Sequence, residues 1–275
     1  YGPLHEASPY FYTQYYEYNI DKSLALTDGL WKKQFNAIAN VNDILAFVDK
    51  KEQIFATNTT HSIIKGEALA LRAFLHFDLL RLYAPHRDAG NGNKKMLPYV
   101  DEFSKNTSAS LTFDEFASKL LADLLAAEKL LKVDPILTGS TIPDLYYKNR
   151  QYHLNYFAVK GLLARVYLYI AGTNKQQAYT CAKEVIQAQQ SKGLFPFVSE
   201  LDATNMDRAK RDRTFSSEHL FTLNIRSLQT FITGYLSQTQ SGLALLPRES
   251  LSDLFEGYPD YRKEFFETDG SIQNV

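Results

Sequence analysis

Hydrophobic side chains recur with helical spacing over most of the first 190 residues of the chain. The longest such segment, residues 61–83, is apolar on almost every face, so it must be covered by other helices. Charged side chains inside such a helix need partners. We expect Asp78 and Arg81, one turn apart, to pair with each other. Glu67 and Arg72 are predicted to form ion pairs and hydrogen bonds between stacked helices, and not to be part of a catalytic site.

Further helical periods occur at residues 28–48, 112–132, 152–171 and 175–190. The first is expected to pair antiparallel with residues 61–83, burying Leu30, Phe35, Ile38, Val41, Ile44, Leu45 and Val48. The second begins with Thr112 and Glu115 at the spacing of a capping box. Its inner stripe is predicted to be Phe113, Phe116, Leu120, Leu124 and Leu131, and its outer face Lys119, Asp123, Lys129 and Lys132. Residues 152–171 are again apolar all round, and residues 175–190 place Ala178, Ala182 and Val185 inward.

The remaining segments lack a sustained period. Residues 1–18 suggest a loop with a short helix. Pro85 is expected to end the helix of residues 61–83, and residues 88–98 are predicted to form a surface loop. From residue 195 to 246 the pattern indicates a mostly irregular region with few strands. A last helical passage is expected to begin at Pro247 and to bury Leu251, Leu254 and Phe255.

Composition excludes several classes of function. A chain of 275 residues can bury a large core without disulfides or metal, and its one cysteine, Cys181, is predicted to be a small core side chain. With 30 basic and 31 acidic residues and no stripe of Lys and Arg, nucleic acid is not an expected partner. The apolar runs are far shorter than the roughly 20 residues that cross a bilayer.

Catalytic and metal-binding motifs are absent from the sequence. It has no Gly-x-Ser-x-Gly, His-Glu-x-x-His, Cys-x-x-Cys or phosphate loop, and its six histidines are scattered without the spacing of metal ligands. His76, inside the most apolar helix, is interpreted as a hydrogen-bonded core residue. We therefore predict no catalytic residue, no metal and no cofactor.

Aromatic residues supply the positive signal for binding. The chain has 18 Tyr, 18 Phe and one Trp, and its tyrosines are concentrated in residues 1–18. Because sugar rings present apolar C–H faces, a flat aromatic platform with polar neighbours can hold a glycan. The candidate platform residues are Tyr10, Tyr12, Tyr15 and Tyr16. The alternative, that these side chains only pack against the first helices, stays open.

Residues from several helices together resemble the SusD/RagB family of surface glycan-binding lipoproteins. The residues that carry the resemblance are Gly66-Glu67-Ala68, Leu71-Arg72-Ala73-Phe74, Phe77-Asp78-Leu79 and Arg81-Leu82-Tyr83, with Trp31, Phe35, Ile38, Asn40, Asp123-Leu124, Ala127-Glu128, Leu130-Leu131 and the run from Ala158 to Leu168. Weaker likeness continues at residues 218–223 and 260–262.

The resemblance implies an all-α fold of tetratricopeptide-like helical repeats with a loop-rich, mostly irregular region. It implies one SusD-like domain over residues 1–275, with the repeats in residues 27–192 and the start of the irregular subdomain in residues 193–275. Family members are longer, so we expect a fragment without the signal, the lipid anchor and the C-terminal subdomain.

The resemblance also implies a non-enzymatic outer-membrane lipoprotein at the cell surface. Such a protein captures an oligosaccharide and delivers it to a TonB-dependent transporter of the SusC type. The alternative is a helical-repeat adaptor that binds a peptide or protein segment, and a weaker third is an enzyme with an unrecognised site.

Overall fold

The structure of the chain is a computed structural model that describes residues 10–55, 57–90, 93–137, 145–170, 174–207, 210–212, 214–228, 230, 267–269 and 272–274. Its contacts divide the chain into two units. One comprises Tyr1–Leu30, Pro196–Glu218 and Leu223–Val275, and the other comprises Trp31–Phe195 and His219–Thr222. We call the second the helical unit and consider each unit by itself.

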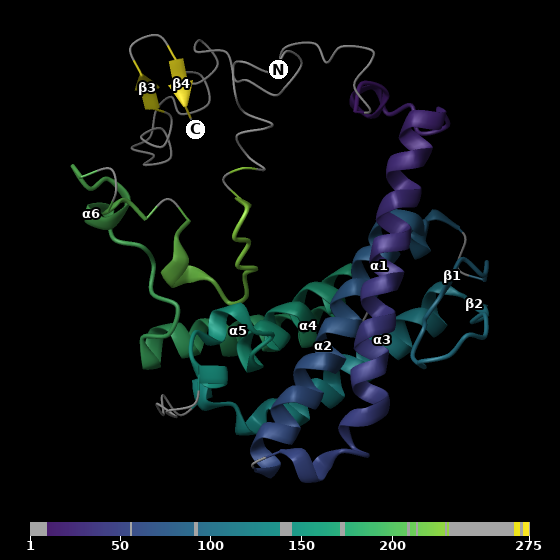
Figure 1. Ribbon diagram of the computed structural model, residues 1–275, viewed down its shortest axis with the longest axis horizontal. Helices are drawn as coiled ribbons and strands as arrows, with labels where there is room; N and C mark the ends of the chain where they lie inside the picture. The colour runs from purple at the N-terminus through teal and green to yellow at the C-terminus, as the bar shows by residue number, and fades with distance from the viewer. Residues whose placement is uncertain are drawn as a thin grey trace. The chain divides into compact units, whose positions relative to one another are not determined.

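Long helices dominate the described residues (Figure 1). They are α1 (Asp21–Val48), α2 (Asn58–Tyr83), α3 (Phe113–Leu130), α4 (Tyr156–Ile170) and α5 (Lys175–Lys192), with the short α6 (Glu200–Ala203). In the helical unit, α2 packs on α3, α3 on α4 and α4 on α5. This stacking of neighbouring helices is the all-α helical-repeat architecture that the sequence predicts.

Short strands and 3-10 turns make up the other described elements. Strand β1 (Leu97–Pro98) pairs antiparallel with β2 (Ser110–Leu111), and β3 (Glu267–Asp269) with β4 (Ile272–Asn274). The 3-10 turns are η1 (Tyr12–Tyr15), η2 (Glu52–Ile54), η3 (Arg87–Ala89), η4 (Leu131–Val133), η5 (Pro135–Leu137), η6 (Leu145–Tyr147), η7 (Arg150–Tyr152) and η10 (Ser216–Glu218).

Helices α1 and α2 run antiparallel, as predicted. The ring of Trp31, early in the part of α1 that belongs to the helical unit, lies 5.0 Å from the ring of Tyr83 at the end of α2. Beyond the other end of α1, Asp49 binds Lys65 of α2 with an N–O distance of 2.6 Å. Contacts that link the start of one helix to the end of the other require opposite directions.

Local sequence signals set the helix ends. The predicted capping box is present: the Thr112 hydroxyl accepts from the Glu115 amide at 3.3 Å, and the Glu115 carboxylate accepts from the Thr112 amide at 2.8 Å. Helix α4 begins at Tyr156 and not at Tyr152, because the Asn155 side chain accepts from the Ala158 amide in the manner of an N-cap.

The core of the helical unit includes the predicted inner stripe of α3 and Leu131 of η4, which directly follows that helix. These residues are all at most 1 % exposed: Phe113, Phe116, Leu120, Leu124 and Leu131. Cys181 is buried among apolar side chains, which confirms its predicted role. Several predictions were wrong. Leu30, predicted to be buried, is 40 % exposed, and Leu97, in the predicted surface loop, is 4 % exposed and lies in β1. Ile44 is 48 % exposed, because it lies about 100° around the helix from the buried side of Leu45. Asp123 is buried, because it pairs with Arg72 of α2.

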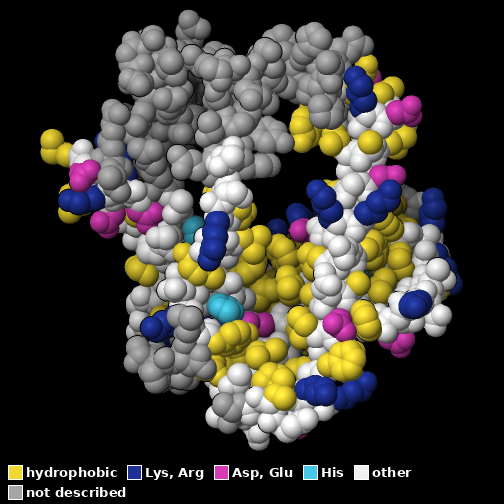
Figure 2. All heavy atoms as spheres, viewed as in Figure 1, with side chains coloured by type: hydrophobic (Ala, Val, Ile, Leu, Met, Phe, Trp, Pro, Cys, Tyr) yellow, Lys and Arg dark blue, Asp and Glu magenta, His cyan; other side chains and the backbone are white. Residues whose placement is uncertain are grey.

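The helical passage predicted from Pro247 lies outside the described residues, and so do residues 231–246 of the predicted irregular region. On the face drawn in Figure 2, Lys and Arg side chains of the described residues are scattered among acidic and apolar ones.

Two helical glycines differ in the space beside them, which gives a matched test of the packing. A Cβ atom on Gly66 would lie 2.8 Å from Cγ of the fully buried Leu131, whereas a Cβ on Gly29 would meet nothing within 4 Å. We expect Gly66→Ala to lower the free energy of unfolding by about 1–2 kcal/mol, since overpacking exceeds the gain in helix propensity. Gly29→Ala is expected to raise it by up to about 1 kcal/mol. Urea unfolding would measure both, and a shift of the two midpoints in the same direction would contradict this packing.

Candidate functional site

The tyrosine-rich segment at residues 10–18 places the predicted platform residues around one short turn, η1. The ring of Phe11 lies 5.0 Å from that of Tyr12 and 5.4 Å from that of Tyr15, with edge-on geometry in both pairs. The Thr13 hydroxyl donates to the Tyr10 carbonyl at 2.7 Å and fixes the start of the turn. The chain thus brings the rings of Tyr12 and Tyr15 together around Phe11, whereas the ring of Tyr16 lies 6.4 Å from that of Tyr18.

The candidate tyrosines differ in exposure. Tyr10 is 37 % exposed, Tyr15 56 % and Tyr16 79 %, whereas Tyr12 is half-buried. The Lys22 ammonium lies 5.7 Å from the centre of the Tyr12 ring. Tyr10, Tyr15 and Tyr16 are therefore the exposed candidates, whereas Tyr12 packs edge-on against Phe11.

Tyr16 has an unusual backbone conformation. Its φ of 60° and ψ of 24° are left-handed, a region that bulky side chains rarely adopt. The turn holds it there, because the Tyr16 amide donates to the Thr13 carbonyl at 3.1 Å. Backbone strain of this kind is concentrated at binding and active sites. Here it accompanies the most exposed of the candidate rings.

A buried ion pair joins α2 to α3. Arg72 donates from Nε and Nη2 to the two carboxylate oxygens of Asp123, both at 2.7 Å. The Tyr99 hydroxyl donates to the same carboxylate at 2.6 Å, and Arg72 Nη1 donates to Asn42 Oδ1 at 3.0 Å. Both charged side chains are almost fully buried. This network connects α1, α2 and α3, so we assign it a structural role.

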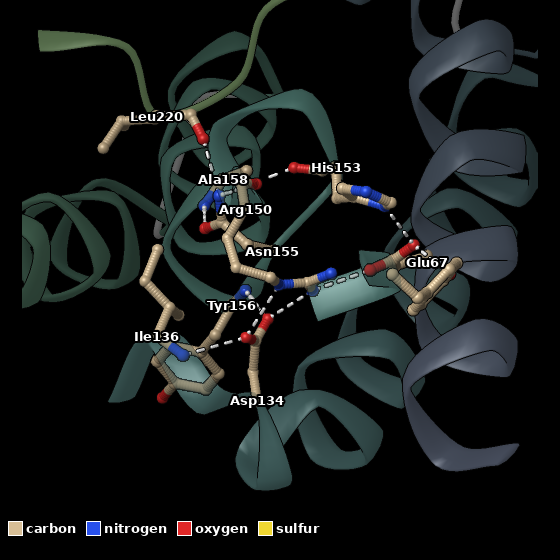
Figure 3. A network of polar contacts seen from close by, with 10 residues as sticks. Glu67, Asp134, Ile136, Arg150, His153, Asn155, Tyr156, Ala158 and Leu220 are labelled. Atoms are coloured by element: carbon tan, nitrogen blue, oxygen red, sulfur yellow. Dashed lines mark hydrogen bonds and ion pairs between the residues drawn. The ribbon is translucent and has the colours of Figure 1, made fainter. Parts of the chain in front are cut away.

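A second network centres on Arg150, shown in Figure 3. Its guanidinium binds Asp134 through two hydrogen bonds of 3.0 and 2.7 Å, and its Nη2 lies 2.6 Å from Glu67 Oε1. Glu67 also accepts from the Tyr146 hydroxyl at 2.8 Å and lies 3.1 Å from His153 Nδ1. Burial opposes ionisation of Glu67, but these hydrogen bonds and the Arg150 charge hold its pKa below the usual value. The network ties α2 to the chain before α4.

A third buried charge, Lys160 of α4, joins α3 to α5. Its Nζ lies 2.9 Å from Glu128 Oε1 and 2.7 Å from Glu184 Oε2, and the Tyr156 hydroxyl donates to Glu184 at 2.6 Å. Burial disfavours the charged amine, yet the two carboxylates raise the Lys160 pKa above its usual value. With Asp78 and Arg81 paired on α2, these contacts confirm that the charges in the apolar helices have structural partners.

The residues that the structure describes contain no group of three or more His, Cys, Asp or Glu side chains able to hold a metal ion. None of their helices combines the length and the hydropathy needed for a membrane span.

The stacked helices place the chain in the class of all-α helical-repeat proteins. A family model of SusD-like proteins, described as starch-binding and associating with the outer membrane, matches residues 6–168. This match covers more than half of the chain, which therefore belongs to the SusD-like family. No curated protein sequence matches the chain.

Solved structures share this fold. A SusD superfamily protein from Bacteroides thetaiotaomicron VPI-5482 is 21 % identical, with a TM-score of 0.57 over 84 % of this chain and 45 % of that one. A SusD-like carbohydrate binding protein from Bacteroides vulgatus ATCC 8482 is 21 % identical, with a TM-score of 0.52 over 72 % of this chain and 40 % of that one. The chain thus spans less than half the length of these relatives.

Proposed function

We propose that the protein captures an oligosaccharide at the outer-membrane surface and delivers it to a TonB-dependent transporter of the SusC type. Membership of a family described as starch-binding and outer-membrane-associated supports the ligand class and the location. The name of the Bacteroides vulgatus relative, a SusD-like carbohydrate binding protein, points the same way. In this proposal the protein binds its ligand without catalysis and is held to the membrane by a lipid anchor.

The observation that carries the proposed site is the exposed ring of Tyr16 on its strained turn. Together with Tyr10 and Tyr15, it offers aromatic faces against which the C–H faces of a sugar can stack. The phenol hydroxyls can donate to and accept from sugar hydroxyls at the edge of the same surface. Glycan affinity is expected to depend on these rings.

Isothermal titration of the full chain with starch-derived, plant, host and microbial oligosaccharides tests this function. Tyr16→Ala is expected to weaken binding about tenfold, the effect of losing roughly 1.4 kcal/mol of stacking. Tyr179→Ala, which removes a similarly exposed ring from α5, is the matched control and should bind as the unaltered chain does. Equal affinity of all three proteins would exclude this tyrosine segment, and failure to bind any of the glycans would exclude the function.

A further inference from the structure

A four-residue segment, His219–Thr222, belongs to the helical unit, although the residues on either side of it belong to the other unit. The chain leaves the helical unit after Phe195, returns to it for these four residues and leaves it again at Leu223. None of the four residues lies in a helix or a strand. We call this segment the strap, because it contacts the helices in the way that a short peptide would.

Two main-chain groups of the strap are bound by the helical unit. The Leu220 carbonyl accepts from Asn155 Nδ2 at 2.7 Å, a contact drawn in Figure 3. The Thr222 amide donates to the Gln151 carbonyl at 2.8 Å. In peptide recognition, main-chain hydrogen bonds give affinity, whereas the places that receive the side chains give specificity.

The two central side chains of the strap supply such specificity. The Phe221 ring packs edge-on against Phe74 of α2, with 6.0 Å between the ring centres. Leu220 lies against Gly161 of α4, where a Cβ atom would come within 3.1 Å of Leu220 Cδ1. Both strap side chains are partly buried against the core. This surface therefore fits a leucine that is followed directly by a phenylalanine.

The surface under the strap is held in place by other contacts. Asn155 is fully buried, its Nδ2 also donates to the Arg150 carbonyl at 2.9 Å, and its Oδ1 accepts from the Ala158 amide at 3.0 Å. These two hydrogen bonds fix the Asn155 side chain at the start of α4 whether or not Leu220 is bound. The apolar contacts of the strap lie within α2 and α4, whose main-chain hydrogen bonds are internal. Opening of the strap thus leaves a formed surface.

We propose that Phe74, Gln151, Asn155 and Gly161 form a peptide-docking site, which we call the strap site, and that the strap is its ligand within the same chain. The strap opens and closes on this site without unfolding of the helices, because a short segment with few buried contacts opens at a lower free energy than the core. When the strap is open, the strap site accepts a separate peptide with the same Leu-Phe pair. The inference does not depend on glycan binding.

A synthetic peptide of residues 216–226 tests the strap site by amide-resolved NMR of the isotopically labelled full chain. Leu220→Asp combined with Phe221→Ser releases the strap, so the peptide should then shift the amides of Phe74, Gln151 and Gly161 along a saturating curve. Adding Gly161→Leu to this variant places a side chain where Leu220 lay. We expect this addition to weaken binding of the peptide at least about tenfold.

The matched control is Leu223→Asp combined with Ile225→Ser, which alters two exposed side chains outside the helical unit. The strap still fills its site in this variant, as in the unaltered chain, so the peptide should shift the amides of neither protein. Shifts of equal affinity in the unaltered chain would overturn the proposal. An absence of shifts in the variant with the released strap would also overturn it, and so would loss of that variant's helical circular dichroism.

Hydrogen exchange of the unaltered chain measures the opening of the strap without any substitution. The Thr222 amide should be at least about tenfold less protected than the Val159 amide, which donates to the Asn155 carbonyl inside the core at 3.0 Å. Low concentrations of urea should leave exchange at Thr222 unchanged, because local opening exposes little surface. Equal protection of the two amides, with the same dependence on urea, would show that the strap opens only with the helices and would overturn the proposal.

Discussion

Asp123→Ala is expected to lower the free energy of unfolding by about 3–5 kcal/mol. The substitution leaves the charge of Arg72 buried without its counter-ion, since both nitrogens that bind the carboxylate lose their acceptor. The Tyr99 hydroxyl, also buried, loses its acceptor as well. Breaking one side of a buried pair costs more than the pair itself contributes, because the remaining charge stays desolvated.

Urea unfolding gives the size of this effect, provided that the dependence on urea concentration stays constant between variants. Asp78→Ala is the matched control, because Asp78 pairs with Arg81 on the more exposed side of the same helix, α2. Such a pair contributes at most about 1 kcal/mol. Similar losses of unfolding free energy in the two variants would show that Arg72 and Asp123 do not form a buried ion pair between α2 and α3.

A double variant separates the cost of an orphaned charge from that of lost packing. Arg72→Met with Asp123→Leu removes both charges and keeps apolar volume, so it should recover a substantial part of the stability lost in Asp123→Ala. Recovery would be incomplete, because Asn42 Oδ1 and the Asp101 carbonyl also lose their donor. A double variant less stable than Asp123→Ala alone would instead assign the effect to packing.

Local signals in the sequence predicted where the helices lie better than they predicted which side chains pair between helices. The capping box at Thr112 and Glu115 needs only neighbouring residues, and the apolar stripe of α3 follows from its period. The pairing of Arg72 with Asp123 joins positions 51 residues apart, and it depends on how α2 and α3 are aligned. The period of one helix does not specify how two helices are aligned, so Asp123 was predicted to lie on the outer face of α3.

The candidate sites show the same limit. Residues 1–18 have aromatic content but no period, so the sequence left open whether their rings pack inward or face solvent. The structure exposes Tyr10, Tyr15 and Tyr16, while their role in glycan binding stays a prediction.

His76 is expected to make the protein lose stability on acidification. The buried ring is neutral in the fold: its Nδ1–H donates to the Arg72 carbonyl at 2.9 Å, and its Nε2 accepts from the Val100 amide at 3.0 Å. Burial lowers the pKa of His76 from 6.5 to about 4, because the charged ring would be desolvated, and the nearby Arg72 charge adds to the effect. Protonation would also remove the acceptor that holds Val100.

The direction of the stability change depends on whether the folded or the unfolded state of the protein binds the proton. Above about pH 6.5 the ring is neutral in both states, and its full contribution is present. As the pH falls toward about 4, the unfolded chain binds the proton while the folded chain does not, so stability decreases. Each pKa unit corresponds to 1.36 kcal/mol, which gives a loss of about 3 kcal/mol from this group across that window.

Unfolding free energies measured at several pH values between 4 and 7 would test this expectation, with His76→Gln as the non-titrating comparison. The variant loses the stacking of His76 on Tyr99, whose rings lie 3.9 Å apart, so it should be less stable at pH 7. Because glutamine binds no proton in this range, the difference between the two proteins should narrow as the pH falls. Parallel curves would contradict a lowered pKa, and so would an NMR titration of the unaltered chain in which His76 protonates near pH 6.5. If the ring instead titrates near pH 4, the hydrogen bond from the Val100 amide to His76 persists throughout the mildly acidic range.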